Sequence, residues 1–200
     1  MKIVFSGGEW RVTRGETELD AFVKKFVRLL DERGVNYALV SGYAAILFGR
    51  SRNSEDVDVF VERMDEKRFA VFWERVSREF EPLIPSKAKE AFQDYLCEGL
   101  SVRFAKRGGA AVPNVEMRFP KTEIDEWTLA HAAKASLNGF ELRVSPLELQ
   151  IPFKLYLGGE KDFEDARHLW LVCREHLNKT LLNEFIIKLK QENNAAKWLK

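Results

Sequence analysis

Residues 41–61 constrain the fold of this chain more than any other stretch. An apolar segment ends in Ser41-Gly42, a short apolar helix is expected next, and a polar loop leads into an apolar strand that begins with Asp56 and Asp58. Residues two apart on a strand point to the same face, so the two carboxylates are expected side by side. Such a pair repels itself unless a cation lies between the charges, and Mg²⁺ is commonly held by one or two carboxylates together with phosphates.

The dipeptide Ser41-Gly42 is expected where the strand turns into the helix. Unpaired backbone N–H groups at such a junction attract phosphate, and a glycine lets the backbone approach a ligand closely. The alternative is that Ser41 simply caps the helix, and both roles are compatible because they use the same place. The stretch therefore predicts both halves of a metal–nucleotide site.

This ordered pattern resembles the nucleotidyltransferase fold of the DNA polymerase β superfamily, whose signature is a Gly-Ser or Gly-Gly turn, a helix, and Asp-x-Asp on the next strand. It is more closely similar to minimal stand-alone nucleotidyltransferases, among them the abortive-infection toxins of type IV toxin–antitoxin systems. Their Gly-x-x-Arg-x-Thr-x-Asp-hydrophobic-Asp string is matched here by Gly49, Arg52, Ser54, Asp56, Val57 and Asp58. The resemblance implies that Arg52 and Ser54 belong to the nucleotide site, with Arg52 on the triphosphate or on an acceptor RNA phosphate. The alternative for Arg52 is a surface charge.

A third carboxylate is usual on a neighbouring strand of this superfamily. The best candidate is Glu116, which alternates with apolar residues over 113–119. The resemblance implies that Glu116 completes a magnesium site with Asp56 and Asp58 and acts as base toward the attacking hydroxyl. The alternative is an ordinary solvent-facing strand residue.

A second constellation lies towards the C-terminus, where Lys154 interrupts an apolar run and is followed by Asp162 and Asp165. A buried lysine needs a charged partner or a polar cleft. The two aspartates, three apart on a helix, share one face. This segment resembles the Lys … Lys-Asp-x-x-Asp-Ala segment of the toxin-like transferases, which implies that all three residues reach the nucleotide site. The alternative is a helix start at which acidic residues favour the positive end of the dipole.

The pattern of elements predicts an α/β (α+β) fold, with a small mixed sheet flanked by helices. We expect a nucleotidyltransferase-like core over 1–120 and a mainly helical section over 121–200 packed on it. The expected elements are a hairpin over 1–15, strands at 37–40, 57–61, 100–105 and 112–119, a hairpin over 133–144 that turns at Asn138-Gly139, and helices from about 17, at 65–80, 86–97, 122–132, 162–177 and 179–197. A loop punctuated by Pro82 and Pro85 is expected before the helix over 86–97. The run after Ser145 alternates like a strand, and Pro152 opposes both a strand and a helix. Because Ser145-Pro146-Leu147-Glu148 predicts a capping box with Pro146 at the first helical position, we expect a kinked helix there.

Composition limits the partners and the compartment. The chain of 200 residues has 32 Lys and Arg against 31 Asp and Glu, which does not favour a strong non-specific nucleic-acid binder. Two cysteines are too few for a disulfide framework, and no apolar run is long enough for a signal peptide or a membrane span. We therefore expect a cytoplasmic protein without a membrane partner.

The resemblance implies a Mg²⁺-dependent enzyme, with two ions expected, that moves an NMP from a nucleoside triphosphate to an RNA hydroxyl, such as a tRNA 3′ end, or to a protein hydroxyl. By resemblance it is the toxin of a toxin–antitoxin pair, with an antitoxin protein as partner. The alternative is a non-catalytic nucleotide- or partner-binding module that keeps the fold, and divergence at the third carboxylate would favour it.

Overall fold

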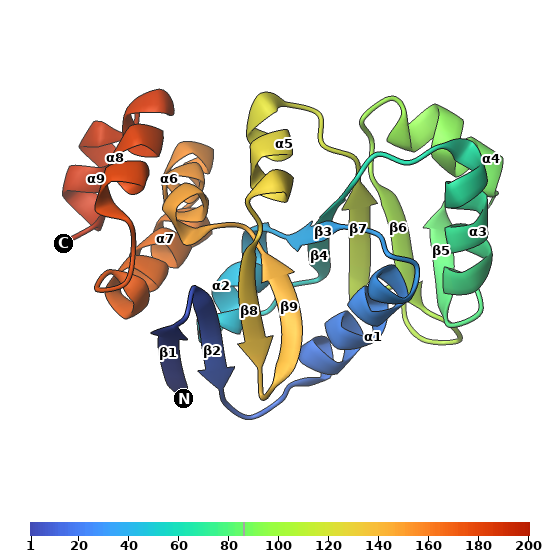
Figure 1. Cartoon of the computed structure of the whole chain (residues 1–200), viewed down its shortest axis with the longest axis horizontal. Coiled ribbons are helices and arrows are strands. Elements are labelled where there is room, and N and C mark those ends of the chain that lie inside the picture. Colours follow the sequence, from blue (N-terminus) through green and yellow to red (C-terminus); the bar gives the residue numbers. More distant parts are fainter. Residues whose placement is uncertain (86) are drawn as a thin grey trace.

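The computed structural model describes residues 1–85 and 87–200, and the strands in these ranges form one mixed nine-stranded sheet. The strand order is β1-β2-β8-β9-β3-β4-β7-β6-β5 (Figure 1). The predicted α/β class is thus confirmed, although the sheet is larger than the small one expected. Ser86, predicted as the first residue of a helix over 86–97, lies outside the described residues.

The middle of the sheet is built from the segments that the sequence pattern singled out. Strand β3 (Tyr37–Leu39) pairs antiparallel with β4 (Asp56–Val61), and β4 pairs parallel with β7 (Asn114–Arg118). Helix α2 (Ser41–Leu47) follows β3 directly and is buried from Gly42 to its end. The apolar residues of β4 are all buried, as in a strand covered on both faces.

The N-terminal hairpin and first helix agree with the prediction. Strands β1 (Lys2–Ser6) and β2 (Glu9–Thr13) turn through Gly7-Gly8, and both glycines have positive φ. Helix α1 (Glu18–Glu32) begins with a capping box, in which Thr17 and Asp20 satisfy each other's backbone N–H.

The far end of the sheet differs from the prediction. Helix α3 (Glu66–Val76) is shorter than expected, and strand β5 (Phe80–Ile84) forms where a proline-punctuated loop was predicted. Pro82 is tolerated because β5 is an edge strand, whose outward N–H groups have no strand partner, and its pairing with β6 (Val102–Lys106) is irregular at Pro82. A short α4 (Ala88–Glu90) and the π-helical turn η1 (Ala91–Leu96) lie between β5 and β6.

The section after residue 120 contributes to the sheet as well as to the helices. Helix α5 (Glu123–Ala130) leads into β8 (Ala133–Leu137) and β9 (Phe140–Val144), which turn through Asn138-Gly139 as predicted. Strand β8 pairs parallel with β2, and β9 pairs parallel with β3. The hairpin therefore joins the N-terminal strands to the middle of the sheet. The division of the chain at residue 120 stays a prediction.

The remaining helices gather at one end of the molecule, away from α3 and α4 (Figure 1). They are α6 (Leu147–Leu157), α7 (Glu160–Cys173), α8 (Lys179–Lys188) and α9 (Glu192–Trp198). Helix α6 packs against α7 and α8 and is buried nearly all round, which is why its sequence lacks a helical stripe. The expected capping box at its start is wrong: Pro146 occupies the N-cap, and the Glu148 carboxylate accepts from the backbone N–H of Asn178 instead.

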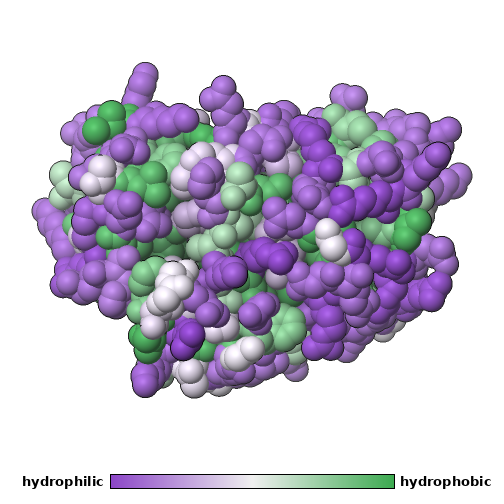
Figure 2. Space-filling model, in the orientation of Figure 1, coloured by the Kyte–Doolittle hydropathy of each residue, from purple (hydrophilic) through white to green (hydrophobic). Residues whose placement is uncertain are grey.

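None of the helices in the described ranges is both long and apolar enough to cross a membrane. The face shown in Figure 2 is mostly hydrophilic, with hydrophobic residues in small separate patches.

Candidate functional site

Asp58 and Glu116 lie side by side on neighbouring strands. The parallel register of β4 and β7 pairs Asp58 with Glu116 and Asp56 with Asn114, so Asp56, Asp58 and Glu116 all project from one face of the sheet. Asp56 is exposed at the start of β4, whereas Asp58 and Glu116 are half-buried. The strand pairing thus gathers the three carboxylates that the sequence singled out.

The carboxylates disfavour one another's charge. Burial, with Asp56 next and Glu116 after it, raises the pKa of Asp58 to about 6, against the opposing effects of a hydrogen bond from Ser41 and the charge of Arg118. A divalent cation would relieve this repulsion, and an all-oxygen donor set suits Mg²⁺. The residues therefore fit the metal that the resemblance implies.

Glu116 is nevertheless held by another partner. Its Oε1 lies 2.5 Å from Nη2 of Arg103 on the next strand, β6. Within residues 1–85 and 87–200, no three histidine, cysteine, aspartate or glutamate side chains are gathered closely enough to hold a metal ion as they stand. Glu116 would have to turn from Arg103 to join Asp58 around an ion.

Ser41 adopts an unusual backbone conformation beside this pair. Its φ of 58° is rare for a residue with a side chain, and it follows the fully extended Val40. The turn is held from both sides, because Val40 N–H donates to the Asp58 carbonyl at 3.0 Å and Gln150 Nε2 donates to the Ser41 carbonyl at 3.2 Å. Backbone strain of this kind persists where the surroundings fix it and is frequent at ligand-binding sites.

Gly42 makes room for Arg52. A Cβ placed on Gly42 would lie 2.0 Å from Arg52 Nη2 and 3.1 Å from Ser54 Oγ, so the guanidinium lies against the backbone of the turn. Ser54 Oγ donates to the Asp56 carbonyl at 2.9 Å, which fixes the loop just before the carboxylates. The predicted residues Ser41, Gly42, Arg52 and Ser54 are thus brought together next to Asp56.

The predicted C-terminal residues meet Arg52 in a partly buried ion cluster, consisting of Arg50, Arg52, Lys154, Asp162 and Asp165. Asp165, which is fully buried, has Lys154 Nζ at 3.2 Å, Arg52 Nη1 at 3.3 Å and Arg50 Nε at 3.5 Å from its oxygens. Lys154, 2% exposed, also donates to Asp162 at 2.7 Å. The cluster connects α6 and α7 to the loop before β4, and its contact with the turn at Gly42 runs through Arg52.

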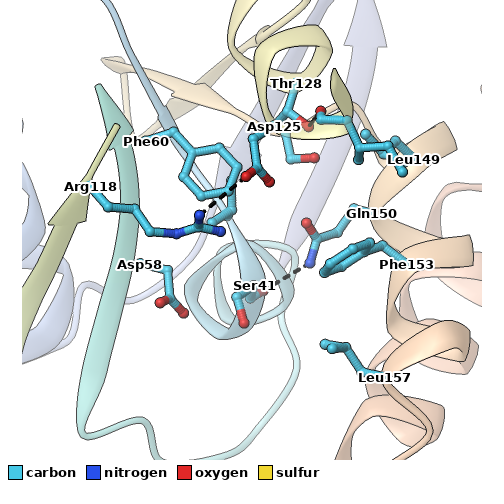
Figure 3. Close-up of a pocket in the computed structure, with 13 residues that line it drawn as sticks. Ser41, Asp58, Phe60, Arg118, Asp125, Thr128, Leu149, Gln150, Phe153 and Leu157 are labelled. Atoms are coloured by element: carbon cyan, nitrogen blue, oxygen red, sulfur yellow. Dashed lines mark hydrogen bonds and ion pairs between the residues drawn. The ribbon is translucent and has the colours of Figure 1, made fainter. Parts of the chain in front are cut away.

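A cavity of about 280 Å³ opens on the other side of Ser41 and Asp58 (Figure 3). Its walls are the sheet, α5 and α6, and most of its lining is apolar. Arg118 stacks on Phe60 at 4.3 Å from the ring centroid, and its Nη1 pairs with Asp125 Oδ2 at 3.1 Å. Helices α5 and α6 contribute Thr128, Leu149, Gln150, Phe153 and Leu157 to the lining.

Sequence reasoning found Ser41 and Asp58 but missed the other residues that line this cavity. Arg118 lies two positions after Glu116 on β7, so the alternation that selected Glu116 also places Arg118 on the same face. Phe60 could be found from Asp58 by the same argument. Gln150 carries no such signal, because it lies in an apolar helix whose packing depends on elements distant in the sequence.

Comparisons with solved structures identify the fold. The chain superposes with a TM-score of 0.55 on an antigenic nucleotidyltransferase-like protein from Paracoccidioides brasiliensis, at 18% identity over 91% of this chain and 92% of that one. It superposes equally well, with a TM-score of 0.55, on the antibiotic-resistance factor ANT(2″)-Ia, at 13% identity over 88% of this chain and 94% of that one. No family model matches the sequence, and no curated protein matches it significantly. The predicted nucleotidyltransferase fold is confirmed.

Proposed function

We propose that this protein is a Mg²⁺-dependent nucleotidyltransferase that moves an NMP from a nucleoside triphosphate to a hydroxyl of an RNA, such as a tRNA 3′ end, or of a protein. The observation that carries the proposal is the placing of Asp58 opposite Glu116 and beside the strained turn at Ser41. That arrangement puts carboxylates for a metal next to a turn suited to phosphate, on a fold shared with nucleotidyltransferase-like proteins.

In the proposed reaction, Asp56 and Asp58 would hold the metal, with Glu116 as a third ligand once it leaves Arg103. A magnesium ion held by these carboxylates would supply positive charge that offsets the negative charge of the phosphates in the reaction. The backbone at Ser41 and Gly42 and the guanidinium of Arg52 orient the triphosphate. Glu116 accepts the proton of the acceptor hydroxyl while the hydroxyl oxygen forms a bond to the α-phosphorus of the triphosphate. The bond between the α-phosphorus and the α–β bridging oxygen breaks, and pyrophosphate leaves.

The ion cluster positions Arg52 beside the turn at Gly42. Asp165 holds Arg52 against the turn, so that the guanidinium faces the phosphates without reorganisation. Lys154 pairs with both Asp165 and Asp162 and so keeps Asp165 in place. The proposal also includes the biological setting expected from the resemblance, which is a cytoplasmic toxin neutralised by an antitoxin protein.

The test is label transfer. Full-length protein is incubated with each α-³²P-labelled NTP, Mg²⁺ and either total RNA or protein lysate, and the products are resolved on denaturing gels. We expect label on one acceptor class from one or more of the four NTPs, and none after chelation or in the Asp56→Asn/Asp58→Asn variant. Transfer that persists in the double variant would contradict the assigned site.

The second candidate is a nucleotide-binding module without catalysis. The observation that favours it is the pairing of Glu116 with Arg103 at 2.5 Å, which withholds the third carboxylate. This candidate predicts Mg²⁺-dependent NTP binding by calorimetry without label transfer to either acceptor class.

A further inference from the structure

The amide of Gln150 is fixed in one orientation. Gln150 is 3% exposed, and its amide lies against the carbonyl of Ser41. A carbonyl oxygen only accepts hydrogen bonds, so the amide atom that faces it must be the donor Nε2. Oε1 is then directed away from Ser41 into the cavity, as Figure 3 shows. In the described part of the chain no donor is bonded to this oxygen, and it is not among the fully buried side-chain oxygens that lack a partner, so it remains open to a donor that enters the cavity.

The cavity around this oxygen suits a flat group with apolar faces and a polar edge. Phe60 and Phe153 face it from the sheet and from α6, and Leu149 and Leu157 complete the apolar wall (Figure 3). A volume of about 280 Å³ admits a group the size of a nucleobase. Because Arg118 already stacks on Phe60, Phe153 is the aromatic ring on which such a group would stack. Because Ser41 and Asp58 also line the cavity, a group inside it would be attached to a ligand whose phosphates lie at the turn.

We propose that Gln150 is a specificity-determining residue whose Oε1 accepts a hydrogen bond from the exocyclic amino group of a nucleobase in this cavity. The inference rests on the proposed function for the identity of the ligand as a nucleotide. The base belongs either to the donor triphosphate or to the 3′-terminal nucleotide of an RNA acceptor, and the chemistry of recognition is the same. Bases that lack the amino group leave Oε1 unpaired, and a buried polar group without a partner weakens binding.

The experiment measures preference for the amino group rather than affinity alone. In the first arm, calorimetry with Mg²⁺ compares α,β-methylene analogues of CTP with UTP, and of ATP with purine riboside triphosphate. In the second arm, fluorescence anisotropy compares RNA oligonucleotides ending in C or U, with the preferred analogue at saturation. We expect roughly tenfold preference for the amino-bearing base in one arm, which identifies the source of the base.

Three variants separate this role from a structural one. Gln150→Met removes the amide at similar size and should abolish the preference for the amino-bearing base. The variant also loses the hydrogen bond to the Ser41 carbonyl, but this loss weakens the binding of all ligands alike and cancels in the ratio of their affinities. Gln150→Glu keeps an acceptor oxygen but cannot donate to Ser41, so we expect weaker binding with the preference retained. The control is Thr128→Val, which removes a different polar group from the cavity wall and should leave the preference unchanged.

Two results overturn the inference. Nucleotide and RNA binding without an amino preference in either arm, or a preference that survives Gln150→Met, contradicts the role of Gln150 but leaves the proposed function intact. Absence of any Mg²⁺-dependent nucleotide binding in the wild-type protein overturns the proposed function and the inference with it.

Discussion

Asp58 on β4 and Glu116 on β7 occupy the same register position on adjacent parallel strands. Their side chains share one face although 58 and 116 are far apart in the sequence, and a third carboxylate, Asp56, lies two residues before Asp58 on that face. The fold thus holds carboxylates close together that would lie far apart in the unfolded chain, and their mutual repulsion opposes the charge of Asp58.

Replacing Asp58 should stabilise the metal-free protein. The carboxylate of Asp58 is disfavoured in the fold by burial and by its neighbours, as its raised pKa of about 6 indicates, so Asp58→Asn removes a destabilising charge at pH 7.5. We expect a gain in the free energy of unfolding on the order of 1 kcal/mol, measured by urea denaturation in EDTA. Adding Mg²⁺ should stabilise the wild type and leave the variant unchanged. A variant less stable than the wild type in EDTA would show that Asp58 is not under repulsion.

Glu116→Gln should affect the chemical step and spare nucleotide binding. If Glu116 is the base, we expect kcat to fall at least ~100-fold with KM changed by less than about threefold, because the lost interaction belongs to the transition state. Steady-state label transfer measures both constants. The control is Arg103→Gln, which removes the ion-pair partner but keeps the carboxylate and should retain transfer. A matching rise in KM with kcat unchanged would assign Glu116 to binding instead.

Gly42→Ala should displace Arg52 without unfolding the protein. The new Cβ would lie 2.0 Å from Arg52 Nη2, the tip of a flexible side chain, so the guanidinium must leave the turn while the backbone stays. We expect a stability loss below about 1 kcal/mol and NTP affinity reduced roughly tenfold, the value of one charge-assisted hydrogen bond. Calorimetry and thermal denaturation measure the two effects. Gly15→Ala is the matched control, since a Cβ there meets nothing within 4 Å. Unchanged affinity in Gly42→Ala would exclude Arg52 from the nucleotide site.

Asp165→Asn should be strongly destabilising. Asp165 is fully buried and its oxygens face Arg50, Arg52 and Lys154. Its neutralisation removes the ion-pair partner of Arg52 and leaves the buried Lys154 with Asp162 alone. Breaking a buried ion pair from one side costs about 3–5 kcal/mol, which a shift in the urea midpoint would show. Glu164→Gln serves as control, because Glu164 also pairs with Arg50 but its side chain is 49% exposed, and such pairs contribute about 1 kcal/mol or less. Equal effects of the two substitutions would mean that the cluster is not held by Asp165.

The stability contributed by Asp20 should depend on pH. Burial alone would raise the pKa of Asp20, but hydrogen bonds from Arg14 and Thr17 outweigh it, so the pKa is lowered. A lowered pKa means that the stabilisation is present above the unfolded-state value near ~3.9 and is lost as the pH falls through the folded-state pKa. Asp20 also accepts from the Tyr43 hydroxyl at 2.9 Å, which links α1 to the helix that follows Ser41.

Asp20→Asn should therefore cost about 3 kcal/mol at pH 7, where the ion pair with Arg14 is complete, and less below about pH 4. Urea denaturation of both proteins across this pH range measures the difference. A difference that stays constant down to pH 3 would show that the charge of Asp20 is not what stabilises the fold.

Local patterns predicted the middle of the fold, together with the carboxylates and the Ser41-Gly42 turn of the candidate site. The Asp56–Asp58 alternation, the glycine at position 42 and the Asn138-Gly139 turn act through neighbouring residues, so a sequence read in short windows reveals them. The strand β5 was missed because Pro82 ordinarily excludes a strand, and only its position at the sheet edge makes it acceptable. The pairing of Glu116 with Arg103 and the orientation of Gln150 depend on which strands and helices become neighbours, and no short window contains that information.

The placement of β8 and β9 between β2 and β3 governs the order in which this chain can fold during synthesis. The N-terminal hairpin reaches the sheet through β8, and the backbone of Arg14 is hydrogen-bonded to Asn138, 124 positions later. Strands β3, β4 and β7 can pair as soon as β7 leaves the ribosome, whereas β1 and β2 must wait for the hairpin over 133–144. Until then the edge of β2 that pairs with β8 in the finished sheet has no partner strand, and an unpaired strand edge on a nascent chain is open to pairing with other chains.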